Sequence, residues 1–83
     1  MAVRDEVWIA VIERIIEDGK FRIGELDIDE GKRHTARRVL RFMESDEVQF
    51  LTRDHNRAQI WRAGPKARED LNLSMRAQVL ADE

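Results

Sequence analysis

The chain has 83 residues, of which 15 are Lys or Arg and 17 are Asp or Glu, and it has no cysteine. A chain of this length forms one small domain, which packing alone must stabilise because neither disulfides nor a thiolate zinc site is available. The net charge of −2 excludes a general polycation, and without a ~20-residue apolar run or a secretion signal in the opening MAVRDE we expect a cytoplasmic protein with no membrane span.

The first predicted helix covers Val3–Asp18, and Gly19 is expected to end it in the left-handed conformation. Its apolar stripe is Trp8, Val11, Ile12 and Ile15, widened by Ile9 and Ile16. Phe21–Ile23 alternates as a short edge strand does, and Gly24–Ile28 has the length of one helical turn, with Leu26 and Ile28 facing the core.

The second long helix is predicted from Lys32 to Ser45. At helical spacing it has one apolar stripe, formed by Ala36, Val39, Leu40 and Met43. The opposite face carries His34, Arg37, Arg38 and Arg41. No acidic residue occurs between Lys32 and Met43, so this helix does not neutralise its own charge, although each arginine alone is equally consistent with a solvated ion pair.

An acidic cluster of Asp27, Asp29 and Glu30 precedes the basic helix, where it favours the positive end of the helix dipole. The alternative, a divalent-cation site, is less favoured because the glycine-centred loop and terminal glutamate of an EF-hand are missing. His34 has no neighbouring nucleophile or carboxylate with triad-like spacing. The sequence has no phosphate-binding glycine loop, so we predict neither an enzyme nor a cofactor or metal site.

Two short strands, Val48–Leu51 and Gln59–Trp61, are joined by the polar segment TRDHNRA and predict a hairpin. Asp54 and Asn56 are turn-stabilising residues. The loop also contains residues with no evident turn role, which we expect to project from it: Arg53, His55 and Arg57. A solvated loop without a function is the alternative interpretation.

Gly64 and Pro65 predict the start of a third helix that continues through Lys66 to Leu71. The apolar positions of the C-terminal part are Leu71, Leu73, Met75, Val79 and Leu80. We divide the chain into a domain of residues 1–73 and a segment of residues 74–83. This segment has the pattern of a separate amphipathic helix, a dimerisation segment or a frayed tail.

Taken in order, these elements resemble a winged helix-turn-helix DNA-binding domain. The resemblance covers residues 4–72 and rests on FRIGELDIDEGKRHTARRVLRFMESDEV followed by VQFLTRDHNRAQIWRAGPKAREDL. It is similar to the pattern of bacterial and archaeal repressors, in which an eL element, a turn, a TxRRVLxxME recognition helix and a two-stranded wing succeed one another. The arginine-rich, acid-flanked style is similar to that of small archaeal regulators of haloarchaeal or viral type.

The resemblance implies an α+β fold, with a three-helix core, a small antiparallel sheet with its wing, and a C-terminal helix. It also implies that the basic helix enters a DNA major groove while loop 52–58 lies on the backbone or in the minor groove. The DNA-binding residues would be Lys32, Arg33, His34, Thr35, Arg37, Arg38, Arg41, Arg53, His55 and Arg57. The second helix, at residues 24–28, is shorter than the family usually has.

We therefore expect a small transcriptional regulator that binds double-stranded DNA sequence-specifically and represses by occluding its site. A homodimer through the terminal helices suits this role, because one domain of this size reads only a short half-site. The alternative is a winged-helix adaptor subunit that binds protein through its apolar C-terminal segment and does not bind DNA.

Overall fold

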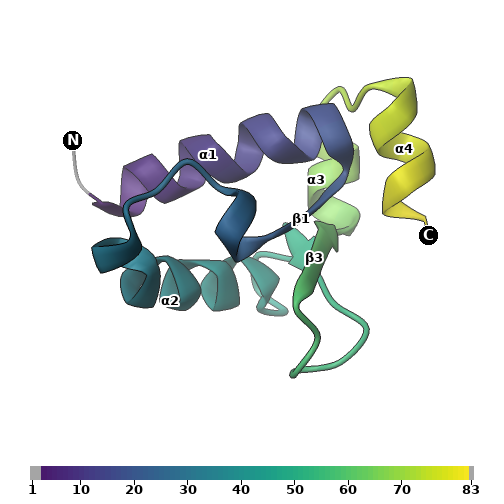
Figure 1. Cartoon of the computed structure of the whole chain (residues 1–83). Helices are drawn as coiled ribbons and strands as arrows, with labels where there is room; N and C mark the ends of the chain where they lie inside the picture. Colours follow the sequence, from purple (N-terminus) through teal and green to yellow (C-terminus); the bar gives the residue numbers. More distant parts are fainter. Residues whose placement is uncertain (1–2, 83) are drawn as a thin grey trace.

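A computed structural model describes residues 3–82 of the chain. This part has an α+β fold, in which four α-helices and two 3₁₀ turns surround a three-stranded antiparallel sheet (Figure 1). The elements in chain order are α1 (Val3–Asp18), β1 (Lys20–Arg22), η1 (Ile23–Glu25), η2 (Glu30–Lys32), α2 (Arg33–Glu44), β2 (Leu51–Thr52), β3 (Ile60–Ala63), α3 (Pro65–Asp70) and α4 (Met75–Ala81).

Helix α1 has the predicted bounds, and Gly19 ends it with a φ of 76°. Glycine is required here for two reasons. A Cβ is sterically unfavourable at this left-handed φ, and an added Cβ would also lie 2.1 Å from the carbonyl oxygen of Ala77 in α4. The Gly19 carbonyl accepts a hydrogen bond from the Ala63 amide at 3.0 Å, so this residue joins α1, β3 and α4.

The face that α1 buries differs from the predicted stripe. Val7, Val11 and Ile15 are fully buried, whereas Trp8 is only partly buried and packs against the core. Ile9, which was expected to widen the stripe, is 46% exposed. The stripe is rotated towards Val7 because α1 packs on both α2 and α4, which the pattern of a single helix does not reveal.

The sheet order is β1-β3-β2, so β1 is an edge strand, as predicted, displaced by one residue from the expected range. Phe21 pairs with Trp61 across β1 and β3, and Leu51 pairs with Ala63 across β2 and β3. All four side chains are buried, which places the core between this sheet and the helices. The helical turn expected at residues 24–28 is shorter and earlier, because the 3₁₀ turn η1 ends at Glu25 and Leu26 is extended. Leu26 is buried in the core and Ile28 packs against it, as predicted.

The prediction of a strand from Val48 to Leu51 is wrong for its first three residues. The amides of Val48 and Gln49 donate to the carbonyl of Ser45, at 3.1 and 2.7 Å, and Gln49 has a left-handed φ of 51°. The Phe50 amide donates to the Met43 carbonyl at 2.8 Å. This closing turn of α2 satisfies backbone groups locally and overrides the β propensity of the side chains.

Pro65 starts α3 at its first turn, as predicted. Ser74 caps α4: its hydroxyl oxygen accepts a hydrogen bond from the Ala77 amide at 3.0 Å, and the hydroxyl donates to the Glu17 carbonyl at 3.0 Å. The buried residues of α4 are Ala77 and Ala81, while Met75 and Val79, predicted as apolar positions of this segment, are 80% and 60% exposed. Residues 75–81 are thus an amphipathic helix, packed by its alanine face onto α1.

Helix α2 lies along one side of the molecule, opposite α1, and the β2–β3 loop extends beyond the body of the fold near the C-terminal end of α2 (Figure 1). Leu51, in the strand before this loop, is 1% exposed, and Trp61, in the strand after it, is 5% exposed. The fold therefore anchors both ends of the loop in the core and holds it beside the outer face of α2.

Candidate nucleic-acid interface

The outer face of α2 is basic and its inner face is apolar. Ala36, Leu40 and Met43 are completely buried and Val39 is 7% exposed, which confirms the predicted inner stripe. The exposure of the predicted outer face is also confirmed for His34, Arg37, Arg38 and Arg41, and Thr35 beside them is exposed as well. A short helix packed by one apolar stripe thus leaves these side chains exposed to solvent.

Within residues 3–82, the guanidinium groups of Arg37, Arg38 and Arg41 make no ion pair or hydrogen bond. Lys32, at the start of the helix, differs, because its Nζ lies 3.2 Å from a carboxylate oxygen of Glu6 on α1. Arg33 is half-buried, with its guanidinium beside Gly24. The positive charge available to an outside anion is therefore concentrated on the middle and C-terminal turns of α2.

Glu44, the last residue of α2, binds Arg53 at the start of the β2–β3 loop. Arg53 donates from Nε and from one terminal nitrogen to the two carboxylate oxygens, at 2.6 and 2.9 Å. Its Cζ lies 4.0 Å from the ring centroid of Trp61, and its other terminal nitrogen donates to the carbonyls of Asn56 and Ala58, at 3.0 and 3.2 Å. The hydrogen bonds that Arg53 donates to the Glu44 carboxylate raise the pKa of Arg53 above its ordinary value.

The expectation that Arg53 projects from the loop is wrong, because its side chain is only 8% exposed. Its guanidinium instead binds Glu44 of α2 and contacts Trp61 of β3, which holds the loop against these two elements. His55 also has a turn role that was not expected, since its Nδ1 accepts a hydrogen bond from the Arg57 amide at 3.1 Å. The His55 and Arg57 side chains remain exposed near the tip of the loop.

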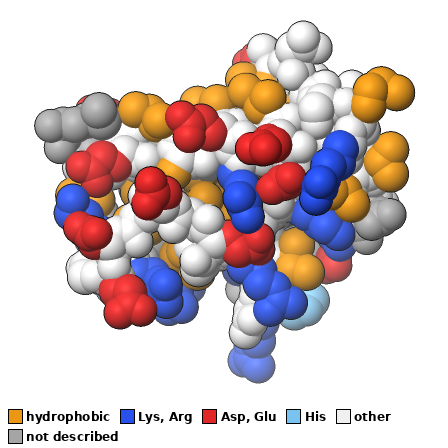
Figure 2. Space-filling model, turned by 45° about the horizontal axis from the view of Figure 1, so that its top comes forward, with side chains coloured by type: hydrophobic (Ala, Val, Ile, Leu, Met, Phe, Trp, Pro, Cys, Tyr) orange, Lys and Arg blue, Asp and Glu red, His pale blue; other side chains and the backbone are white. Residues whose placement is uncertain are grey.

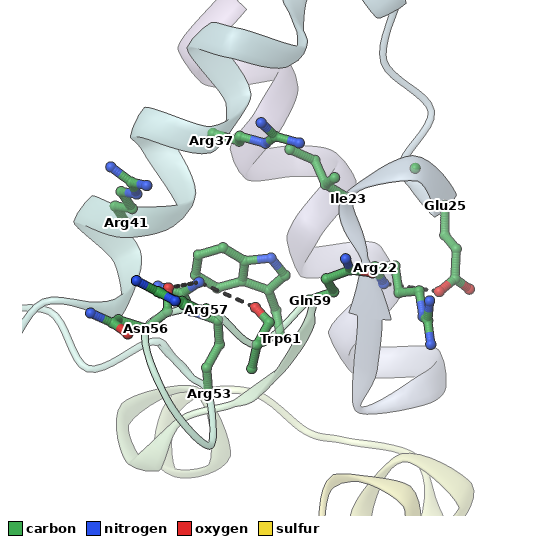
Figure 3. A pocket seen from close by; sticks show the side chains of 12 residues that line it. Arg22, Ile23, Glu25, Arg37, Arg41, Arg53, Asn56, Arg57, Gln59 and Trp61 are labelled. Atoms are coloured by element: carbon green, nitrogen blue, oxygen red, sulfur yellow. Dashed lines mark hydrogen bonds between the residues drawn. The ribbon is translucent and has the colours of Figure 1, made fainter.

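A cleft of about 480 Å³ separates α2 from the β2–β3 loop (Figure 3). Arg37 and Arg41 line it from α2, and Arg57 lines it from the loop. In Figure 3, Arg37 extends from α2 towards Ile23, while the indole of Trp61 lies between the helix and the loop. The rest of the lining is Arg22, Gly24, Glu25, Arg53, Asn56, Ala58 and Gln59.

Glu25 is the one acidic residue among those that line the cleft, and its carboxylate is already paired with Arg14 and hydrogen-bonded to a backbone amide. One carboxylate oxygen accepts from Arg14 at 2.9 Å, and the other accepts from the Arg22 amide at 2.9 Å. These two hydrogen bonds, that from Arg14 first, lower the pKa of Glu25 below its usual value of 4.5. The cleft as a whole is therefore electropositive, which suits an anionic ligand.

Sequence reasoning missed Arg22, Gln59 and Trp61 as cleft residues. Arg22 was placed on a strand, and its outward position follows from the alternation of β1, in which Phe21 is buried and Arg22 is exposed. Trp61 carries no local signal, because its neighbours in the cleft, Arg37 on α2 and Arg53 in the β2–β3 loop, are distant from it in the chain.

The acidic cluster before α2 does not cap this helix by a side-chain hydrogen bond, since its N-cap residue is Lys32 and its first turn contains no acidic residue. Among the described residues, no three His, Asp or Glu side chains are grouped closely enough to bind a metal ion. In Figure 2, acidic and basic side chains are interspersed over the body of the face shown, whereas the projection at its lower edge ends in basic side chains. Positive charge is thus concentrated locally at this projection, although the net charge of the chain is −2.

Comparison of the chain with protein-family models, with curated proteins and with solved structures found no match. None of the helices in residues 3–82 has the length and apolar character needed to cross a bilayer. The features of the described residues that bear on function are the exposed face of α2, the β2–β3 loop and the cleft between them.

Proposed function

We propose that this protein is a winged helix-turn-helix domain that binds double-stranded DNA, with α2 as the recognition helix and the β2–β3 loop as the wing. The observation that carries this proposal is the set of unpaired guanidinium groups on the outer face of α2. Arginine forms planar bidentate contacts with phosphates and with guanine edges, and a helix fits the major groove, which is about 12 Å wide.

The connectivity supports the same proposal. A helix and an edge strand precede a short turn and the basic helix, and a hairpin follows whose second strand pairs with the first strand of the chain. The second helix of the winged pattern is reduced to η1, which contacts α2, and Leu26 directly after η1 is buried in the core.

The size of the domain supports a short DNA site. Its longest dimension is 32 Å, which is about one helical turn of B-DNA, ~34 Å. One copy therefore covers one half-site, and a repressor built from this domain would act as a pair of copies on two half-sites. Occlusion of a promoter by such a pair is the regulatory mode that we propose.

A second candidate function is that of a protein-binding adaptor. Two exposed apolar side chains of α4, Met75 and Val79, favour it. They lie on the opposite side of α4 from Ala77 and Ala81, which pack inward. In this case α4 is the contact surface and the basic face of α2 has no nucleic-acid partner.

The test is binding to a 24-base-pair duplex of mixed sequence, measured by fluorescence anisotropy at several salt concentrations. DNA binding through phosphates predicts that log K falls linearly with log salt, with a slope of ~0.9 for each phosphate contacted. The triple variant Arg37→Ala, Arg38→Ala, Arg41→Ala should lose most of the affinity and should show a smaller slope.

The matched control is Arg76→Ala on α4. Arg76 is also a highly exposed arginine, but it lies on a different helix from the proposed interface. Its Nε is 3.6 Å from a carboxylate oxygen of Asp18. Its loss changes the net charge by the same amount per residue and should leave affinity nearly unchanged. Equal affinity of the triple variant and the unmodified protein would reject the DNA interface and favour the adaptor.

A further inference from the structure

The exposed cations of α2 do not all face the same surroundings. Arg37 and Arg41 line the cleft, whereas His34 and Arg38 are not among its lining residues. His34 lies two turns before Arg41, near the N-terminal end of α2, and the position of Arg38 follows from its angle around the helix. Residues four apart in sequence differ by about 40° around the helix axis, and adjacent residues differ by about 100°. Arg37 therefore shares the cleft side of α2 with Arg41, while Arg38 is rotated by about 100° from Arg37 and does not line the cleft.

The opposite wall of the cleft is held rigidly. Arg53 closes the β2–β3 loop through Glu44, Trp61 and two loop carbonyls, and it is almost completely buried while doing so. Arg57 extends from this closed loop with an exposed side chain and lines the cleft. The loop backbone that carries Arg57 is thus fixed before any ligand arrives, which lowers the entropic cost of binding.

The chemistry of the cleft fits a phosphate group with its attached sugar. Arg37, Arg41 and Arg57 supply positive charge from two sides, and the only acidic lining residue, Glu25, is already hydrogen-bonded to Arg14. Ile23 and Trp61 add apolar surface beside these charges. A base edge offers no comparable negative charge, because its groups are neutral donors and acceptors.

We infer that the cleft binds one sugar-phosphate backbone of the duplex, between Arg37 and Arg41 on α2 and Arg57 on the loop, and that Arg38 and His34 read the bases. This inference rests on the proposed function and divides its contacts into two kinds. Contacts to phosphate position a protein on any duplex, whereas contacts to base edges discriminate between sequences. The arginines adjacent in sequence, Arg37 and Arg38, therefore have different tasks.

The experiment begins with the selection of a preferred duplex from a random-sequence pool by the unmodified protein. The affinity for this duplex and for a mixed-sequence duplex is then measured for Arg37→Ala, Arg57→Ala and Arg38→Ala over a range of salt. Arg37→Ala and Arg57→Ala should weaken both duplexes by the same factor and lower the salt slope by ~1 each. Arg38→Ala should lower the ratio of the two affinities by ~5- to 150-fold.

The reverse pattern, in which Arg37→Ala changes the ratio and Arg38→Ala changes only the overall affinity, would overturn the inference while leaving DNA binding intact. Failure of the unmodified protein to bind any duplex would instead reject the proposed function, and this inference with it. All the substituted side chains are exposed or line an open cleft, and unchanged circular dichroism of each variant verifies that it folds.

A free phosphate has the same chemistry as a backbone phosphate, and a titration separates the two sources. Sodium phosphate is added to the protein without DNA, at constant ionic strength maintained with chloride, while the indole N–H resonance of Trp61 is followed by NMR. We expect a shift of this resonance on addition of the mixed duplex and only weak, non-saturating changes with phosphate up to several millimolar. Saturation by submillimolar phosphate would assign the cleft to a small anion and overturn its assignment to DNA.

Discussion

The guanidinium carbon of Arg53 lies 4.0 Å from the centroid of the Trp61 ring, within the range of a cation–π contact. The same guanidinium binds Glu44 through two hydrogen bonds, of 2.6 and 2.9 Å. One side chain therefore connects the end of α2, the β2–β3 loop and β3. Arg53, which the sequence predicts to be an exposed cation, is instead a buried side chain that connects these three elements.

The first prediction concerns this connection. Arg53→Ala removes the ion pair, the ring contact and two hydrogen bonds to loop carbonyls, so we expect the free energy of unfolding to fall by ~2–3 kcal/mol. Urea unfolding followed by tryptophan fluorescence measures the loss. Arg53→Lys keeps the charge without the planar fork and should recover only part of it.

Arg57→Ala is the matched control for Arg53→Ala, because it removes the same side chain from the same loop at an exposed position. Its effect on the free energy of unfolding should stay within ~0.5 kcal/mol. Both substitutions should lower the affinity for DNA. Arg57→Ala removes a contact to DNA, and Arg53→Ala releases the loop from α2 and β3. A stability loss of similar size in the two variants would contradict the connecting role of Arg53.

The second prediction concerns Gly19. Gly19→Ala places a Cβ 2.1 Å from the Ala77 carbonyl oxygen and forces a left-handed φ on alanine. The left-handed conformation alone costs ~1–2 kcal/mol, and displacement of α4 adds to it. We expect a thermal midpoint at least ~8 °C lower. Gly31→Ala is the control, because nothing lies within 4 Å of its added Cβ, and its midpoint should change little.

The third prediction tests the orientation of α1. Ile15 is completely buried and Ile9 is 46% exposed, so the same change at two sites of one helix isolates the effect of burial. Ile15→Ala should lower the free energy of unfolding by ~2–5 kcal/mol. Ile9→Ala should cost less than ~1 kcal/mol. Similar losses at the two positions would mean that α1 is rotated from the orientation described.

The fourth prediction concerns pH. The hydrogen bond from Arg14, followed by that from the Arg22 amide, holds the pKa of Glu25 below 4.5 in the folded protein. A lowered folded-state pKa means that the carboxylate stabilises the fold above its unfolded-state pKa, and that this contribution disappears as the pH falls through the folded-state value. The contribution is small, because the side chain is 45% exposed and solvent screens its charge.

Urea unfolding at pH values from 7 to 3 measures this contribution as a difference between two proteins. Glu25→Gln should be less stable than the unmodified protein at pH 7, and the two should converge as the pH falls below 4.5. Other carboxyl groups titrate equally in both proteins and cancel in the comparison. A difference that grows towards low pH would contradict the assigned direction.

Local pattern was sufficient for several parts of the fold. The core stripe of α2, from Ala36 to Met43, follows from helical spacing, because residues on one face of a helix recur every three or four positions. The bounds of α1 and the left-handed Gly19 follow from local backbone preferences. The exposed face of α2 was predictable for the same reason, since a helix with one buried stripe must expose the other side.

Hydrophobic periodicity did not predict the buried face of a helix that packs against more than one other element. The face of α1 is shared between α2 and α4, which rotates its buried side towards Val7. Helix α4 buries its alanines rather than its larger Met75 and Val79, because the backbone of α1 at Gly19 approaches it so closely that only small side chains fit between them. Neither choice is visible in the hydrophobic periodicity of one segment.

The amino-acid sequence by itself determined that the chain concentrates exposed positive charge on a single amphipathic helix, since charge and periodicity are both local properties. Only the tertiary structure decided which of these charges are available. It buried Arg53 against Glu44 and Trp61, and it placed Arg57 across a cleft from Arg37. The physical reason is that an ion pair or a cleft depends on which distant segments meet, and packing of the whole core decides that.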